Sequence, residues 1–287
     1  MEIGVMKQKP LSINHIRLNN GIEMPMIGLG TFPMNGLKLA IIVRKAVKMG
    51  YNSFDTSPAY GNEKWLGRGI RLCGKSRAAL FITTKLSNSG QRSGDIRSAL
   101  QNSMSRLGIK YLDLYLMHWP NPETYLKSWK QMETLYKEGL VRAIGVCNFH
   151  EHHLESLLEI ADVAPVINQV ELHPLLSQAN LVEFCKNSGT QITAYSPLAR
   201  MNDKLIRNKV LIGIAKKYEK TVPQIVLRWD YQHQIISIPK SSNAVRLKQN
   251  ISIFDFNLLE EEMDLINQLN IDFRVRYNPD NCDFSKL

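Results

Sequence analysis

The stretch LDLYLMHWP, residues 112–120, sets a short apolar run directly before a polar side chain, His118. Seven more short apolar runs lie along the chain, and nearly every one ends at a residue capable of chemistry. They span residues 26–29, 51–54, 80–84, 141–146, 166–170, 191–194 and 235–238. Segments with helical character fill the intervals, at 37–49, 63–72, 95–107, 125–138, 152–160, 178–187 and 205–218. This alternation of strand and helix predicts a parallel sheet.

Eight such units predict an α/β fold, the (β/α)8 TIM barrel, whose catalytic groups sit at the C-terminal ends of the strands. The chain has 287 residues, which fits one barrel with modest additions, so residues 1–287 are expected to form a single domain. A bare length rule would also permit two domains. However, no linker or change of composition divides the chain.

Segments outside the eight units predict additions to the barrel. Residues 16–24 indicate an N-terminal β-hairpin, turned at Asn20-Gly21, that closes the barrel floor. The last interval between strands is the longest and is expected to hold two helices, the second at 223–231. Helices at 244–251 and 259–269 follow the eighth strand, and residues 271–287 are expected to form a loop over the barrel mouth.

The composition excludes several kinds of partner. The formal net charge is +10, but the Lys and Arg residues are scattered, so a basic surface is expected and no nucleic-acid site. No apolar run reaches the roughly 18 residues of a membrane span. Residues 1–10 lack the apolar core of a signal peptide. The four cysteines form no CxxC pair, and His150, His152 and His153 have no evident partners at metal-ligand spacing, so no metal is expected.

Four polar residues at predicted strand ends or just beyond them are the candidate catalytic group. Asp55 ends the second strand and Tyr60 follows it, while Lys85 and His118 end the third and fourth. Each alone has a plain structural explanation, such as a buried ion pair, a rim tyrosine or a core histidine. Together at one barrel mouth they indicate chemistry: a carboxylate compensates a buried lysine, and the lysine is expected to lower the pKa of the phenol. A phenol so placed can donate a proton.

With these residues in place, the sequence resembles the aldo-keto reductase family, from Gly28 to about Asp272. The strings that carry the resemblance are GLGT at 28–31, DT at 55–56 with Tyr60, ITTK at 82–85, LDLYLMHWP at 112–120, AIGV at 143–146, NF at 148–149, NQVE at 168–171, YSPL at 195–198 and IPKS at 238–241. The overall pattern is most similar to the diketogluconate- and methylglyoxal-reducing branch. The string GLGTFP at 28–33 is a weak dinucleotide motif by itself, because it lacks the third glycine.

The resemblance implies NADPH-dependent reduction of a small carbonyl compound to an alcohol. It implies that Tyr60 is the general acid, that Asp55 and Lys85 tune it, and that His118 orients the carbonyl. It also implies a cofactor site in which Tyr195 stacks on the nicotinamide and Asn148 and Gln169 bind its carboxamide. The other cofactor residues that it implies are Gly30, Thr31, Ser196, Leu198, Lys240, Ser241, Arg246 and Asn250. Lys240 and Arg246 suit the dianionic 2′-phosphate, although by themselves they could be two surface charges.

Three positions depart from the family pattern. Cys147 stands where serine is general, Ser87 where tryptophan commonly follows the third strand, and Phe32 where tryptophan or tyrosine often lines the pocket. Trp119 is retained. Phe32 and Trp119 are therefore the expected walls of a less aromatic substrate pocket.

Two alternatives remain open on sequence alone. One is a non-enzymatic relative that keeps the fold, against which the intact set Asp55, Tyr60, Lys85 and His118 argues. The other is an isomerase or aldolase on the same barrel, for which no phosphate-substrate loop or metal arrangement is found. We expect a cytoplasmic monomer. The C-terminal string SKL, residues 285–287, matches a peroxisomal address and gives the alternative location.

Overall fold

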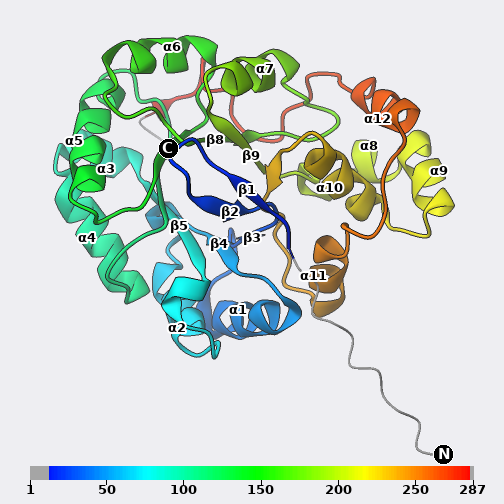
Figure 1. Ribbon diagram of the computed structural model, residues 1–287, viewed down its shortest axis with the longest axis horizontal. Coiled ribbons are helices and arrows are strands. Elements are labelled where there is room, and N and C mark those ends of the chain that lie inside the picture. Colours follow the sequence, from blue (N-terminus) through cyan, green and yellow to red (C-terminus); the bar gives the residue numbers. More distant parts are fainter. Residues whose placement is uncertain (1–12, 285–287) are drawn as a thin grey trace, which may run out of the picture.

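The computed structural model describes residues 13–284, and the predicted barrel is confirmed. Eight parallel strands follow one another in chain order around a single sheet, and helices surround them (Figure 1). The strands are β3 (Leu29–Gly30), β4 (Ser53–Asp55), β5 (Phe81–Leu86), β6 (Leu114–Met117), β7 (Ile144–Cys147), β8 (Ile167–Glu171), β9 (Gln191–Tyr195) and β10 (Ile236–Ser237). Each lies within or beside one of the eight apolar runs.

Backbone hydrogen bonds between the first and last strand segments close the sheet into a barrel. Gly28 N donates to Ser237 O at 2.9 Å, and Ser237 N donates to Met26 O at 3.0 Å. The chains approach closely at this seam, because a Cβ atom on Gly30 would lie only 2.6 Å from the carbonyl oxygen of Ile238. Gly30 therefore has a packing reason to be glycine.

The N-terminal hairpin covers the floor of the barrel, as predicted. Strands β1 (His15–Arg17) and β2 (Glu23–Pro25) pair antiparallel and cross the barrel axis in Figure 1. Gly21 alone takes the left-handed backbone, with φ of +84°, whereas Asn20 accepts the N–H of Ile22 through its side chain. The hairpin residues Leu18 and Met24 are buried in one cluster with inward-facing side chains of the barrel strands. The hairpin thus supplies the apolar bottom layer.

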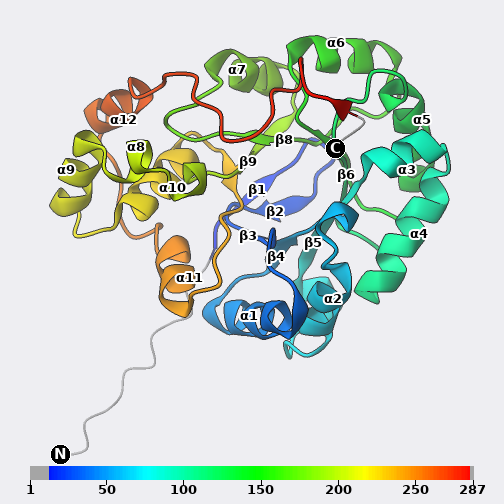
Figure 2. The ribbon, with the colours of Figure 1, turned by 180° about the vertical axis from the view of Figure 1, so that it is seen from behind.

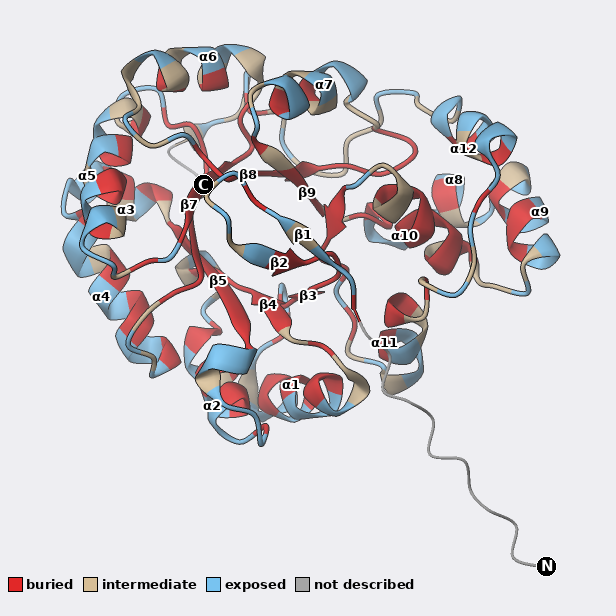
Figure 3. Ribbon diagram, viewed as in Figure 1, coloured by how far each residue is buried: buried red, intermediate tan, exposed pale blue. Residues whose placement is uncertain are grey.

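Twelve α-helices are present in the described residues. They are α1 (Gly36–Met49), α2 (Glu63–Arg71), α3 (Asn88–Ser93), α4 (Ile96–Leu107), α5 (Tyr125–Lys137), α6 (Glu151–Ile160), α7 (Ala179–Asn187), α8 (Asp203–Ile206), α9 (Lys209–Lys217), α10 (Val222–Gln232), α11 (Ala244–Ile251) and α12 (Glu260–Asn267). Their buried faces pack on the sheet and their exposed faces turn outward (Figure 3). Trp129 of α5 and Trp229 of α10 are among the largest buried side chains.

Two helix predictions were wrong in detail. The single helix expected at 205–218 is two, α8 and α9, because the Asn208 side chain accepts the N–H groups of Val210 and Leu211 and starts a new helix. The short helix α3 was not predicted. Ser87 caps it by accepting the N–H of Gly90 at 3.1 Å, and the helix has no apolar periodicity to announce it.

After α12 the chain crosses the mouth of the barrel. Residues 271–283 form neither helix nor strand, and Figure 2 shows this red segment running back over the ring toward α6. This confirms the predicted loop. Within residues 13–284 no helix has both the length and the apolar character that a membrane crossing requires. The string SKL at 285–287 lies outside the described residues.

Candidate active site

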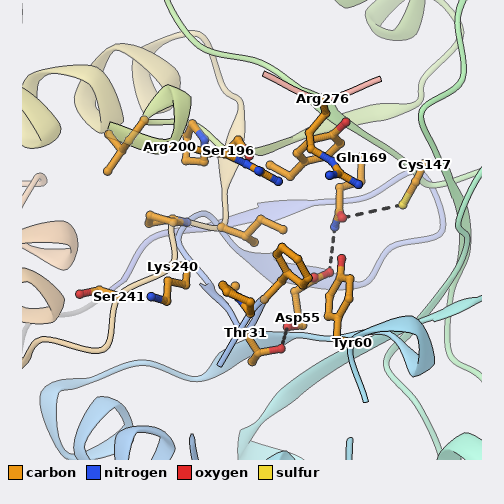
Figure 4. A pocket seen from close by; sticks show the side chains of 18 of the residues that line it. Thr31, Asp55, Tyr60, Cys147, Gln169, Ser196, Arg200, Lys240, Ser241 and Arg276 are labelled. Carbon is orange, nitrogen blue, oxygen red and sulfur yellow. Dashed lines mark hydrogen bonds between the residues drawn. The ribbon is translucent and has the colours of Figure 1, made fainter. Parts of the chain in front are cut away.

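A cavity of about 990 Å³ opens at the C-terminal ends of the strands, where the barrel fold places active sites. It is lined by loops that follow most of the strands and by the C-terminal segment (Figure 4). Every predicted site residue except Lys85 lines it. Lys85 lies beneath the cavity floor, with only 1% of its side chain exposed.

Asp55 and Lys85 form a buried ion pair at the ends of β4 and β5. Lys85 Nζ lies 2.7 Å from Asp55 Oδ1 and also donates to the carbonyl of Thr56 at 3.1 Å. Burial opposes the charged ammonium, but Asp55 and Tyr60 outweigh it and raise the pKa of Lys85. The second oxygen of Asp55 accepts the amide of Gln169 at 2.9 Å. Lys85 therefore stays protonated, and its ammonium lies close to the Tyr60 ring.

Tyr60 ends a 3₁₀ turn, Pro58–Tyr60, which the side chain of Ser57 caps. Gly61 follows with φ of +64° and turns the chain toward α2. Lys85 Nζ lies 5.2 Å from the centroid of the Tyr60 ring. The prediction that the phenol pKa falls below its usual value was wrong. Burial raises the pKa of Tyr60, and Lys85 offsets only part of that rise, so the hydroxyl stays protonated at neutral pH.

His118 directly follows β6 and faces Tyr60 across the cavity, with 6.0 Å between the two ring centroids. Its Nδ1 lies 3.4 Å from the hydroxyl of Ser57. Burial first, and then the charges of Lys85 and Arg276, hold the pKa of His118 well below its ordinary value. The imidazole is therefore neutral near pH 7. Phe32 contacts Tyr60 from outside, with ring centroids 5.1 Å apart, while Trp119 is buried beside His118.

Asn148, Tyr195 and Gln169 form the next part of the cavity wall. The Tyr195 hydroxyl donates to Asn148 Oδ1 at 2.8 Å, and Asn148 Nδ2 donates to the carbonyl of His118 at 2.9 Å. Cys147 Sγ lies 3.8 Å from Gln169 Oε1, a weak contact. Two amide oxygens on this wall thus have spare acceptor capacity. Burial raises the pKa of Cys147, so its thiol stays protonated.

The far end of the cavity is basic and exposed. Lys240 and Arg246 are both solvent-exposed there, whereas Ser241 and Asn250 are buried. Asn243 starts α11 by accepting the backbone N–H of Arg246 at 3.1 Å, which leaves the guanidinium free to reach the cavity. Ser196 and Leu198 line the stretch between the two ends. Thr31 has mainly an internal role, since its hydroxyl donates to the carbonyl of Asp55 at 2.8 Å.

The cavity also has lining residues that were not foreseen, among them Arg200, Met201, Arg276 and Tyr277. Arg200 and Met201 belong to a run with left-handed backbone after β9, where φ is +54° and +63°. Arg276 and Tyr277 come from the C-terminal segment. A loop over the mouth was predicted, but no pattern in the sequence indicates which of its side chains point inward.

The histidines at the start of α6 have a partner that sequence spacing did not reveal. Asp280 Oδ2 lies 2.8 Å from His150 Nδ1, and Asp280 Oδ1 lies 3.5 Å from His152 Nε2. One ligand atom each from His152, His153 and Asp280 lie within 4.8 Å of one another. His153 Nδ1, however, already accepts the backbone N–H of His150 at 3.1 Å. This cluster fastens the C-terminal segment to α6, and the absence of a resident metal stays a prediction.

Comparison with known proteins decides the family. A sequence model of the aldo/keto reductase family matches residues 26–271. The chain belongs to the aldo/keto reductase family. This aldo/keto reductase is 47% identical over 270 residues to the glyoxal reductase of Bacillus subtilis, covering 94% of this chain and 97% of that protein.

Solved structures agree with this assignment. The aldo-keto reductase MGS-M4, from a deep-sea metagenome library of the Medee basin, superposes with a TM-score of 0.91 at 41% identity, over 93% of this chain and 99% of that one. A Bombyx mori aldo-keto reductase in complex with NADP superposes with a TM-score of 0.87 at 35% identity, over 94% and 96%. The chain is therefore an enzyme of the aldo-keto reductase type with the fold of that family.

Proposed function

We propose that this enzyme uses NADPH to reduce small aldehydes, ketones or dicarbonyls to alcohols, with Tyr60 as the general acid. The observation that carries the proposal is the convergence of Tyr60, His118 and the buried Asp55–Lys85 pair on one cavity floor. The names of relatives support the reaction class, since one is a glyoxal reductase and others are methylglyoxal reductases. The alternative of a non-enzymatic relative does not explain why a buried charge is maintained beneath a protonated phenol.

The residues of the cavity fit NADPH. The cavity extends from Tyr60 at one end to Lys240 and Arg246 at the other. The cavity volume of about 990 Å³ suits a dinucleotide and a small substrate. Lys240, Ser241, Arg246 and Asn250 would hold the adenosine end and its 2′-phosphate. Gly30, Thr31, Ser196 and Leu198 would line the middle.

At the catalytic end, Tyr195 would stack on the nicotinamide. Asn148 Oδ1 and Gln169 Oε1 would accept from its carboxamide, because their amide nitrogens already donate to His118 O and Asp55. When bound, the cofactor supplies the hydride that reaches the carbonyl carbon.

Side chains of the protein supply the proton that the reduction requires. The neutral His118 imidazole and the Tyr60 hydroxyl line the same end of the cavity, where they would bind a carbonyl oxygen. As negative charge develops on that oxygen, the Tyr60 hydroxyl proton transfers to it and an alcohol forms. The Lys85 ammonium stabilises the resulting phenolate, and Asp55 keeps Lys85 in place.

The pocket walls favour small, polar substrates. Phe32 and Trp119 supply aromatic surface near the catalytic groups, but Ser87 contributes only a hydroxyl where it caps α3. A short C-terminal segment buries little of a large ligand, and burial contributes only about 25 cal/mol per Å² of apolar surface. We further propose that the chain acts as one domain, as a monomer and in the cytoplasm.

The test is a side-by-side assay of cofactor oxidation with methylglyoxal, a small aromatic aldehyde and a ketosteroid, using NADPH and NADH. We expect NADPH turnover with the first two substrates and a lower kcat/KM for the ketosteroid. A protein that oxidises NADPH with none of them contradicts the proposal, and a preference for the ketosteroid contradicts the substrate class.

A further inference from the structure

The C-terminal segment is attached to the active site by one buried carboxylate, Glu171, at the end of β8. Its Oε1 accepts the backbone N–H of Val275 at 2.6 Å, and its Oε2 accepts the backbone N–H of Arg276 at 2.8 Å. The Glu171 side chain is fully buried, so these two bonds are shielded from water. This attachment fixes the backbone from which the Arg276 side chain departs. Glu171 itself pairs with Tyr195 on the next strand.

The Arg276 guanidinium lines the catalytic cavity, and among residues 13–284 no carboxylate forms an ion pair with it. Glu171, which binds its backbone, contacts the N–H groups of Val275 and Arg276 and the His173 ring. The described contact of the guanidinium is with the face of the Tyr277 ring, whose centroid lies 4.9 Å away. Figure 4 places Arg276 on the wall with Ser196 and Gln169, across the cavity from Tyr60.

The charge of Arg276 acts on a residue at the catalytic end of the cavity. It contributes to the lowered pKa of His118, the residue proposed to bind the carbonyl. Arg274, two residues earlier, behaves differently. Its guanidinium donates to His150 Nε2 and Gln178 Oε1, both at 3.2 Å, and it does not line the cavity.

We infer that Arg276 binds an anionic group of the substrate, so that this enzyme prefers small carbonyl compounds that carry a carboxylate. This rests on the proposed function and narrows its substrate class. A guanidinium offers paired N–H donors that match a carboxylate, and such charge-assisted pairs are strong where water is partly excluded. A carbonyl held by His118 and Tyr60 and a carboxylate held by Arg276 would fix the substrate at two points. That arrangement favours the reacting geometry as well as binding.

The experiment measures kcat/KM with NADPH for matched pairs of aldehydes. Glyoxylate, succinic semialdehyde and 4-carboxybenzaldehyde are each compared with the primary amide of the same skeleton, which is similar in size but neutral. The three skeletons sample different distances between the carbonyl and the charge. We expect at least one carboxylate to exceed its amide by roughly 10- to 100-fold, the range of one charge-assisted hydrogen bond.

Variants then assign the preference to the residue. Arg276→Met should lower kcat/KM for the preferred carboxylate far more than for its amide, so that the preference disappears, and Arg276→Lys should keep part of it. Arg274→Met is the matched control and should keep the full preference. Binding of NADPH, followed by fluorescence titration, should be the same in wild type and Arg276→Met.

Three results would overturn the inference: no carboxylate preferred in the wild type, a preference that survives Arg276→Met, or NADPH binding weakened as much as the carboxylate rate. In each of these the neutral aldehydes are still reduced, so the proposed function stands. Failure to reduce any aldehyde of either kind would instead remove the proposed function together with the inference.

Discussion

The Asp55 carboxylate divides its oxygens between two buried donors, the Lys85 ammonium on one side and the Gln169 amide on the other. One acid therefore sets two features of the site. It retains the charge under Tyr60, and it orients the Gln169 amide so that Oε1 is left for a ligand. Single residues at this site act through their neighbours, and the consequences of changing them depend on which neighbour is left unpaired.

Tyr60→Phe tests the proton donor. The substitution keeps the ring contact with Phe32 and removes only the hydroxyl, so NADPH affinity should stay close to that of the wild type. Loss of a positioned general acid should lower kcat by roughly 10²–10⁴-fold. Stopped-flow or steady-state reduction of methylglyoxal measures this. Tyr277→Phe, which removes an exposed phenol at the cavity rim, should retain most activity. Near-normal turnover in Tyr60→Phe would show that another group supplies the proton.

Arg246→Ala tests the basic end of the cavity. Its backbone N–H continues to cap α11 through Asn243, so the helix should persist while the guanidinium is removed. If that guanidinium meets the 2′-phosphate, NADPH binding should weaken by about 1.5–3 kcal/mol while NADH binding changes little. Fluorescence titration of both cofactors measures the difference. Lys248→Ala, on the same helix but outside the cavity, is the control, and equal losses for NADPH and NADH would contradict the contact.

At the scale of the elements, the seam where the first and last strands meet restricts which residue can occupy position 30. Gly30→Ala would place a Cβ 2.6 Å from the carbonyl oxygen of Ile238, a backbone atom that cannot move without opening the seam. We expect a loss of about 1–3 kcal/mol in the free energy of unfolding, measured by urea denaturation. Gly213→Ala in α9 is the matched control. No atom lies within 4 Å of its added Cβ, so it should stabilise the protein by about 0.5–1 kcal/mol. A tolerated Gly30→Ala would mean that the seam is looser than described.

How far the sequence predicts the elements depends on the kind of signal each one carries. The eight strands and most helices have apolar periodicity, and their order alone placed Asp55, Lys85 and His118 at one end of the barrel. Helix α3 has no such periodicity, and its only mark is the capping side chain of Ser87. The split between α8 and α9 rests on a single capping residue, Asn208. The inward direction of Arg276 depends on Glu171, more than one hundred positions earlier in the chain, as the separation of 105 between them indicates. No local pattern reports that contact.

The pKa values of the site residues were harder to predict than which residues form the site. The presence of Lys85 beside Tyr60 follows from the strand pattern, but the net direction of the phenol pKa does not. It depends on how completely the surrounding elements exclude water, which is a property of the packed molecule. Burial outweighs the nearby ammonium here, and the expected lowering became a rise.

At the scale of the whole molecule, one buried acid links helix packing to pH. Asp230 of α10 is fully buried against β10, and its side chain has one described hydrogen bond, which it accepts from the Ser237 hydroxyl. Burial raises the pKa of Asp230 well above its ordinary value. The folded protein therefore binds a proton that the unfolded chain releases above about pH 3.9, so this residue's contribution to stability falls as pH rises toward the folded pKa.

Asp230→Asn removes that titration while keeping the size and polarity of the side chain. We expect the variant to become progressively more stable than the wild type as pH rises from 5, by about 1.4 kcal/mol per pH unit until the folded pKa is reached. Urea denaturation of both proteins at several pH values measures the gap. A gap that does not change with pH would show that Asp230 is ionised in the folded protein.

The attachment of the C-terminal segment through Glu171 has a consequence for how such an enzyme diversifies. The bonds run to the main chain of residues 275 and 276, and almost any amino acid offers the same N–H there. The side chain at 276 is thus free to change without loosening the segment or the barrel beneath it. A point mutation at position 276 can therefore change a side chain that lines the cavity while Asp55, Lys85 and Tyr60 stay as they are. If Arg276 meets the substrate, the catalytic groups and the substrate range can change independently of each other.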